Sequence, residues 1–331
     1  MSKQLCATLW EGFDKVTEAR VVLQELLERS DQDGFSADAV AAAIKAFEDQ
    51  KTDYETLLKT AVSLPDGRAI YATDYLALCK LAADNGINTE KIFKRIENFS
   101  INSTGRLQEI KLNGLGLSHI SALRNLTALA ELSLTHNQII DISPIQKLTA
   151  LTWLNLSSNK IVDISPVQKL TTLTWLNLSS NNIVDIKPVR NLVGLTDLNL
   201  NTNQIINISP IGNLRALEFL GFSQNQIVDI SVFRNLTSLN TLFIEENQIE
   251  DISPIKNLTA LIDLWLNNNQ IMDIRPIKDL TNLASLALKD NQIQDISPIK
   301  HLSVFNSSLL TFENNPLSDA SKALLAARSQ T

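Results

Sequence analysis

Residues 151–172 read LTWLNLSSNKIVDISPVQKLTT, and residues 173–194 read LTWLNLSSNNIVDIKPVRNLVG. The two stretches are one 22-residue unit written twice, and the unit recurs along about two thirds of the 331-residue chain. A fixed period of this length is typical of solenoid proteins, in which each repeat packs only on its neighbours. The sequence therefore predicts a stacked repeat domain rather than a single closed core.

The full unit has the form L-x-x-L-x-L-x-x-N-x-I-x-D-I-S-P-I-x-x-L-T-x. Its asparagine recurs every 22 residues, at Asn137, Asn159, Asn181, Asn203, Asn225, Asn247, Asn269 and Asn291. An opening unit has Leu115 at this position, and a closing unit has Asn315 after a two-residue insertion. Atypical end units suit a solenoid, because each one covers an otherwise exposed hydrophobic face. We predict about ten repeats in residues 105–317, followed by a capping helix and tail in residues 318–331.

Leucines alternate with other residues at the start of each unit, as Trp153, Leu154, Asn155 and Leu156 illustrate. This period of two predicts a short strand with one face inward and one face outward. Stacked copies of the strand form a parallel sheet. Because short helical turns on the opposite side are wider than strands, we expect the sheet to become the concave face of an arc.

Two polar positions of the unit have structural roles in this interpretation. The Asn159 amide is both donor and acceptor, so it can bond the backbone of its own turn and of the next coil. Asp163 precedes Ile-Ser-Pro, where its carboxylate can accept from the following backbone amides at the start of a short helix. A ladder of metal sites is the alternative for the aspartates, but each coil supplies only one carboxylate, so we favour capping.

Residues 1–104 lack the repeat and have the apolar spacing of helices. We predict a small all-α domain of four segments, of which the third ends at Asn85-Gly86 and the fourth begins after Thr89. Asp31-Gln32-Asp33-Gly34 resembles part of a calcium loop. However, the first and twelfth loop positions would be Arg29 and Val40, which cannot serve as carboxylate ligands. An interhelical turn is the preferred interpretation.

Composition excludes several classes of protein. The formal net charge of −7 disfavours nucleic acid or an acidic membrane as a partner. No apolar run approaches the length of a membrane span, so we expect no membrane insertion. Cys6 and Cys79 could pair, although thiols in helical segments are more often small buried hydrophobes. The N-terminal residues have no apolar signal core, so we expect a cytoplasmic protein.

The motif N-x-I-x-D-I-S-P-[IV]-x-x-L-T in residues 107–317 resembles the leucine-rich repeats of internalins and of the related protein phosphatase regulatory subunits. The resemblance implies an α/β solenoid: a curved domain with a parallel sheet on its concave face and short 3-10 helices and turns on its convex face. It also implies that the concave sheet binds proteins.

Outward positions of the strands hold the candidate binding residues. One column has Trp153, Trp175, Asp197 and Phe219, and its neighbour has Asn155, Asn177, Phe243 and Trp265. A third column contributes Glu245 to a polar rim. The repeat core requires no large aromatic residue at these positions. Binding is therefore favoured for the aromatic residues, and mutual packing, such as Trp153 on Trp175, is the alternative.

No constellation of residues predicts catalysis. The histidines His119, His136 and His301 lie in distant units, and the cysteines precede the repeats. We expect no enzymatic activity, no metal and no cofactor. The leading hypothesis is a scaffold or adaptor that binds a protein partner on the concave face. The alternatives are a regulatory subunit whose helical N-terminal domain makes the specific contact, and an exported, internalin-like adhesin.

Overall fold

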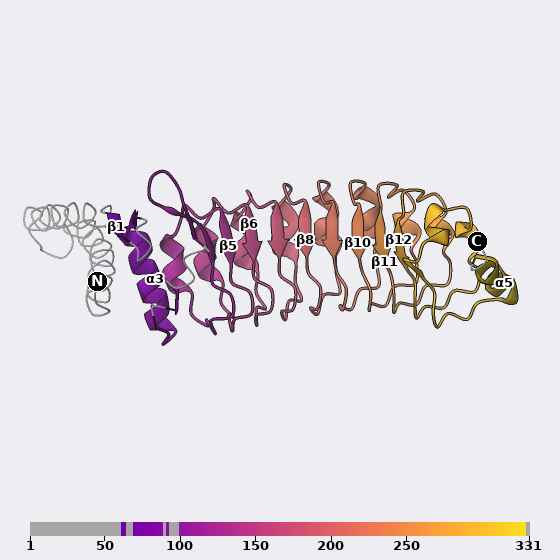
Figure 1. Cartoon of the computed structure of the whole chain (residues 1–331), viewed down its shortest axis with the longest axis horizontal. Helices are drawn as coiled ribbons and strands as arrows, with labels where there is room; N and C mark the ends of the chain where they lie inside the picture. The colour runs from indigo at the N-terminus through magenta and orange to yellow at the C-terminus, as the bar shows by residue number, and fades with distance from the viewer. Residues whose placement is uncertain (1–60, 64–68, 89–90, 93–98, 329–331) are drawn as a thin grey trace, which may run out of the picture. The chain divides into compact units, whose positions relative to one another are not determined.

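The computed structural model of the chain describes residues 61–63, 69–88, 91–92 and 99–328 (Figure 1). The chain divides into two compact units. The first consists of Met1–Lys111 with His119–Leu129, and the second consists of Leu112–Ser118 with Ala130–Thr331.

Among its described residues, the first unit combines the α-helix α3 with short antiparallel strands. Strand β1 pairs with β2, and β3 pairs with β4. The elements are β1 (Ala61–Ser63), β2 (Ala69–Tyr71), α3 (Ala72–Asp84), β3 (Phe99–Ile101), β4 (Leu107–Lys111) and the 3-10 helix η2 (Ser121–Asn125). Strands β1, β2 and β3 correct the prediction that residues 1–104 are all-α. Each has only three residues, which is too short for a period of two to stand out in the sequence.

Helix α3 confirms the third predicted helix, including its end. Asn85 follows it, and Gly86 has the positive φ of 63° that a glycine adopts readily after a helix. At the start of the helix, buried Asp74 accepts hydrogen bonds from Leu107 N at 2.8 Å and from Arg106 Nε at 3.1 Å. The Asp74 carboxylate therefore anchors the start of α3 to the chain at Arg106 and Leu107. The first two predicted helices and most of the fourth lie outside the described residues, as does the Asp31–Gly34 turn.

The second unit is a solenoid whose strands all run parallel (Figure 1). Its strands are β5 (Glu131–Ser133), β6 (Trp153–Asn155), β7 (Trp175–Asn177), β8 (Asp197–Asn199), β9 (Phe219–Gly221), β10 (Thr241–Phe243), β11 (Asp263–Trp265), β12 (Ser285–Ala287) and β13 (Leu310–Thr311). Neighbouring strands pair in sequence order and in register, so equivalent positions of successive repeats lie side by side. The predicted parallel sheet of a leucine-rich-repeat solenoid is confirmed.

Short 3-10 helices form the side of each coil opposite the sheet. They are η3 (Ser143–Lys147), η4 (Ser165–Lys169), η5 (Lys187–Asn191), η6 (Ser209–Asn213), η7 (Ser231–Asn235), η8 (Ser253–Ile255), η9 (Arg275–Ile277), η10 (Ser297–Ile299) and η11 (Ser303–Asn306). Helix α5 (Asp319–Arg328) follows the last strand. The boundaries of the predicted domains stay predictions.

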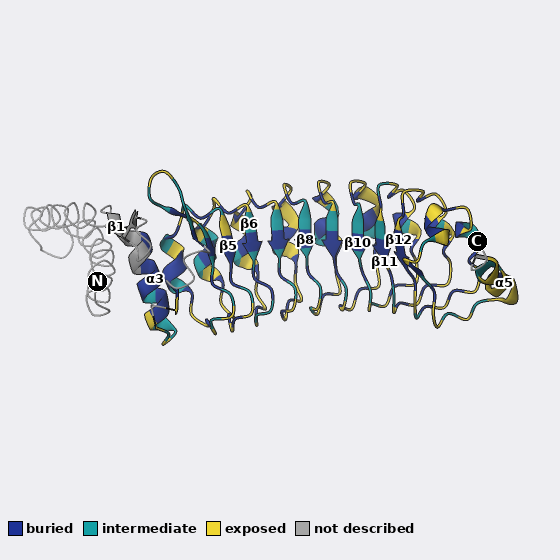
Figure 2. Ribbon diagram, in the orientation of Figure 1, coloured by how far each residue is buried: buried dark blue, intermediate teal, exposed yellow. Residues whose placement is uncertain are grey.

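The interior of the solenoid is aliphatic, and every coil contributes the same positions to it. In the coil of β6, for example, Leu154, Leu156, Ile161, Ile164 and Val167 are at most 1% exposed. Figure 2 shows buried positions recurring along the successive strands. Because each coil is narrow, its buried side chains pack mainly on the equivalent side chains of the two adjacent coils.

The repeated asparagine joins each coil to the one before it. Asn159 Oδ1 accepts from Ile139 N at 3.0 Å, and Nδ2 donates to Leu134 O at 2.9 Å, both in the preceding coil. Nδ2 also donates to Leu156 O at 3.0 Å and Ser157 O at 3.2 Å in its own turn. The predicted ladder is therefore present, although it runs to the preceding coil rather than to the following one.

The repeated aspartate accepts the backbone hydrogen bond that the sequence predicts. Asp163 Oδ1 accepts from Ser165 N at 2.8 Å, and Oδ2 accepts from Ser165 Oγ at 2.9 Å. The N-cap of η4 is Ile164, so the carboxylate acts from one residue earlier than an N-cap side chain would. It closes a local turn that leads the chain into the 3-10 helix.

One residue in each coil has a left-handed backbone that the sequence analysis did not predict. Ser158, for example, has φ of 56°, and its N–H donates to Ser179 O of the following coil at 2.9 Å. Such a conformation costs roughly 1–2 kcal/mol for an L-residue. The non-glycine residues concerned are His136, Ser158, Ser180, Thr202, Gln224, Glu246, Asn268, Asp290 and Asn314. Hydrogen bonding between coils offsets this local cost.

We predict that Asn181→Ala destabilises the solenoid by about 2 kcal/mol or more. Its amide accepts from Ile161 N and donates to Leu156 O, Leu178 O and Ser179 O, and the residue is 8% exposed. Each buried backbone group left unpaired costs about 1–3 kcal/mol. Denaturant unfolding followed by circular dichroism measures the loss.

The adjacent Asn182→Ala variant is the matched control, because Asn182 is exposed and the only described hydrogen bond of its side chain is a 3.5 Å contact from Gln204 Nε2. We expect its stability to match the unsubstituted protein within about 0.5 kcal/mol. Equal losses from the two substitutions would contradict the asparagine ladder as a stabilising feature.

Candidate partner-binding face

The outward side chains of strands β6 to β11, which we call the sheet face, fall into three parallel columns. The first column contains Trp153, Trp175, Asp197, Phe219, Thr241 and Asp263. The second contains Asn155, Asn177, Asn199, Gly221, Phe243 and Trp265. Just beyond the strands, the third contains Ser157, Ser179, Asn201, Ser223, Glu245 and Asn267. Adjacent strands in a sheet are about 4.8 Å apart, so each column is a closely spaced row.

Five aromatic side chains lie on the sheet face in two groups. The rings of Trp153 and Trp175, which we call the tryptophan pair, stack with centroids 4.4 Å apart and planes 11° from parallel. Phe219, Phe243 and Trp265 form the aromatic trio. In the trio, the two phenylalanine rings meet edge to face at 5.4 Å, and Phe243 stacks on Trp265 at 4.2 Å. The rings therefore contact one another and still face solvent.

All five aromatic residues remain partly accessible. Trp265 is the most exposed, at 37%, and its indole Nε1 donates to Ser285 Oγ at 3.0 Å. Trp153, Trp175, Phe219 and Phe243 are half-buried. The structure brings the predicted aromatic residues together on one surface, and it also shows the stacking that we considered as the alternative. A role in binding stays a prediction for each of them.

The asparagines of the second column have a local role that the sequence analysis missed. Asn155 Oδ1 accepts from Ser157 N at 3.1 Å and Ser157 Oγ at 2.8 Å. Asn177 Oδ1 accepts from Ser179 N at 2.9 Å. Both side chains close the turn that ends their strand. Their oxygens are therefore engaged by their own chain, which leaves the amide nitrogens as the groups that a partner could contact.

The charge of the sheet face is negative. Within these described strands and turns, the three columns contain the acids Asp197, Asp263 and Glu245 and no lysine or arginine. Burial raises the pKa of Glu245 above its usual value, and repulsion from Glu246 adds to this effect. A hydrogen bond from Asn267 Nδ2 opposes the rise only in part. The face consequently combines aromatic surface with carboxylates that have no counter-charge within it.

An aliphatic stripe on the flank of the solenoid was not predicted. Position 12 of five consecutive repeats is a large apolar residue that is 49–61% exposed. The residues are Ile140, Val162, Val184, Ile206 and Val228. In the sequence each of them directly follows the buried isoleucine of position 11. Residue type alone therefore does not distinguish these exposed residues from core residues.

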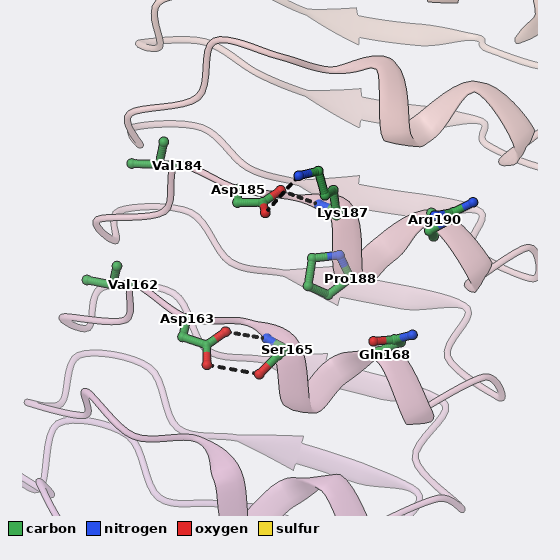
Figure 3. A pocket seen from close by; sticks show the side chains of 9 residues that line it. All are labelled: Val162, Asp163, Ser165, Gln168, Val184, Asp185, Lys187, Pro188 and Arg190. Carbon is green, nitrogen blue, oxygen red and sulfur yellow. Dashed lines mark hydrogen bonds and ion pairs between the residues drawn. The ribbon is translucent and has the colours of Figure 1, made fainter.

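Shallow grooves lie between neighbouring coils beside this stripe. The groove shown in Figure 3 has a volume of about 460 Å³ and lies between the coils of η4 and η5. Asp163 and Ser165 line one side, and Asp185, Lys187 and Pro188 line the other. Two further grooves use equivalent repeat positions in adjacent coils. Because they recur with the repeat, and because the aspartate or asparagine that lines each one is engaged in a turn, we attribute these grooves to the stacking of the coils.

The described residues contain neither a candidate metal site nor a helix that could span a membrane. No three or more His, Cys, Asp or Glu side chains in this part of the chain are grouped as metal ligands would be. No described helix has the length and apolar character needed to cross a membrane.

Comparison with known proteins agrees with this architecture. A family model described as leucine-rich repeats (2 copies) matches residues 127–169, 215–257 and 259–301. No curated protein matches the chain. Among solved structures, an internalin C2 (inlC2) of Listeria monocytogenes is 31% identical, covering 64% of this chain and 92% of its own, with a TM-score of 0.55.

Two further solved structures are similar. An internalin (inlF) of Listeria monocytogenes is 33% identical, covering 72% of this chain and 85% of its own, with a TM-score of 0.49. A leucine-rich-repeat protein of Leptospira interrogans is 24% identical, covering 67% of this chain and 64% of its own, with a TM-score of 0.53.

The parallel strands, the asparagine ladder and the match to the leucine-rich-repeat family model define a leucine-rich-repeat protein, and this fold is a general protein-interaction scaffold. Within that class, the chain belongs to the internalin-like leucine-rich-repeat proteins. Leucine-rich-repeat families are typically non-enzymatic.

We predict that the tryptophan pair is energetically coupled. A double-mutant cycle of Trp153→Ala and Trp175→Ala in denaturant unfolding should give a coupling of about 0.5–1.5 kcal/mol, the usual range for aromatic pairs in contact. The control cycle combines Trp153→Ala with Trp265→Ala, which lie five strands apart, or about 24 Å. That cycle should be additive within about 0.5 kcal/mol. Additivity in both cycles would show that stacking contributes nothing to stability.

We predict that Glu245 makes folding less favourable as pH rises. Because the pKa of Glu245 is raised in the folded state, the native protein holds this proton more tightly than the unfolded chain does. Stability should therefore fall as pH rises from the unfolded pKa, about 4.3, through the higher folded pKa. Thermal unfolding should show Glu245→Gln gaining stability relative to the unsubstituted protein between pH 4 and pH 7. A difference that stays constant over this range would contradict the raised pKa.

Proposed function

We propose that the protein is a non-enzymatic scaffold or adaptor that holds a protein partner on the sheet face. The observation that carries the proposal is the concentration of five solvent-facing aromatic side chains on β6 to β11. The solenoid core is complete without them, because leucine, isoleucine and valine fill every inward column around them except for Phe222 and Phe233.

The dimensions of the sheet face suit a protein interface. From Trp153 to Trp265 is about 24 Å at the usual strand spacing. A standard protein interface buries about 800 Å² on each partner, which is a patch of similar breadth. Tryptophan is over-represented among the residues whose truncation weakens binding most, typically by about 2 kcal/mol or more. Stacked rings are already held in place, so a partner would order few side chains on binding.

The test is affinity capture from the native cell followed by mass spectrometry. The triple variant Trp153→Ala, Trp175→Ala and Trp265→Ala is compared with the unsubstituted protein. We expect the triple variant to lose the specific partners, because a loss of about 2 kcal/mol weakens binding roughly thirtyfold even when only one ring is a hot spot. Circular dichroism and thermal unfolding establish that the variant remains folded.

A second triple variant provides the matched control on the flank of the solenoid. Val162→Ser, Val184→Ser and Ile206→Ser remove exposed apolar surface of the aliphatic stripe without touching the sheet face. We expect this variant to capture the same partners as the unsubstituted protein. Retained capture by the tryptophan variant, together with loss in the flank variant, would overturn the assignment of the site to the sheet face.

A further inference from the structure

A carboxylate occupies the gap between the two aromatic groups of the sheet face. Strand register places Asp197 beside Trp175 on one side and beside Phe219 on the other. Its carboxylate Oδ2 accepts one described hydrogen bond, from Thr196 Oγ1 at 2.7 Å. Asp197 is half-buried. An acid in a row of aromatic rings, within columns that have no basic residue, is a site of unmatched negative charge.

The tryptophan pair determines which part of Trp175 borders this gap. Its ring is nearly parallel to that of Trp153, and the 4.4 Å between the centroids is close to the spacing of the strands. The rings therefore stack along the row of strands. Because Trp153 covers one face of Trp175, the other face is turned toward the next strand, which contributes Asp197.

Two asparagine side chains lie over Gly221, in the column next to that of Asp197. A Cβ atom at this position would lie 2.8 Å from Asn201 Oδ1 and 3.1 Å from Asn199 Oδ1. The two amides therefore occupy the space above Gly221 that a side chain would fill in other repeats. Asn199 Oδ1 accepts from Asn201 N at 3.0 Å, and Asn201 Oδ1 accepts from Ser223 N at 2.7 Å, so both amide oxygens are engaged by their own chain. The gap itself presents the Asp197 carboxylate of β8 together with an aromatic face.

We propose that this gap, bounded by Trp175, Asp197 and Phe219, binds an arginine side chain of the protein partner. The inference rests on the proposed function of the sheet face and names the chemistry that it recognises. A guanidinium group is planar, so it can lie flat on the free face of Trp175 as a third layer of the stack. In that position it can also donate to the Asp197 carboxylate. A lysine ammonium could pair with the acid but would lack the planar stacking surface.

The test uses the full chain, labelled with 15N, and a defined probe, the peptide acetyl-Gly-Gly-Arg-Gly-Gly-amide. Titration is followed through the tryptophan indole N–H resonances, with the Trp175 signal assigned from a Trp175→Phe variant. We expect saturable shifts of the Trp175 resonance. The same peptide with citrulline, which is neutral and similar in shape, should bind at least about tenfold more weakly, because it lacks the charge that pairs with Asp197.

Asp197→Asn should weaken binding of the arginine peptide by the same factor of about ten, and thermal unfolding checks that this variant is folded. Asp263→Asn is the matched control: Asp263 lies in the same column, but its neighbours there are Thr241 and Ser285, neither of which is aromatic. We expect this variant to bind the peptide as the unsubstituted protein does.

The outcomes separate this inference from the proposed function. Equal binding of the arginine and citrulline peptides, or equal losses in the two aspartate variants, would overturn the arginine site. The scaffold proposal would stand if the tryptophan triple variant still lost its partners in affinity capture. Selective loss in Asp197→Asn with the arginine peptide supports the site.

Discussion

The structure depends on the hydrogen bonds of one buried side chain in each repeat. An amide such as that of Asn159 satisfies carbonyl groups in its own turn and a carbonyl and an N–H in the preceding coil. Buried backbone groups must be paired, and few side chains supply donors and an acceptor from so compact a group. The amide therefore fixes both the turn after each strand and the distance between coils. Parallel strands and aligned columns follow from it.

Once the coils are aligned, the fold requires no particular residue at the outward positions of the strands. Inward positions must be aliphatic and asparagine positions must hold their ladder, but residues such as Trp153 and Thr241 occupy equivalent outward positions in different repeats. Aromatic residues in neighbouring strands can then stack, because the spacing between strands is close to the distance between the centroids of stacked rings. Stacking and recognition are therefore compatible: contact between the rings holds them rigid, while their edges and outer faces remain accessible.

Repetition also separates structural features from candidate functional ones. Grooves between the coils use the same repeat positions each time, and their aspartates close turns, as Asp163 does for Ser165. By contrast, the outward residues of the sheet face differ from strand to strand. Only at Asp197 does an acid lie between two aromatic residues of the same column. Similarity to internalin C2 supports the shared architecture.

The sequence by itself determined the period, the strand positions, the parallel sheet, the structural roles of Asn159 and Asp163, and the helix before the repeats. These features follow from patterns within one 22-residue unit or one helix. Only the tertiary structure decided the left-handed backbone at Ser158, the direction of the asparagine ladder and the raised pKa of Glu245. It also decided how the aromatic rings group around Asp197 and that short strands accompany the first described helix. Each of these depends on groups that lie in a neighbouring coil or strand, where the local sequence pattern carries no signal.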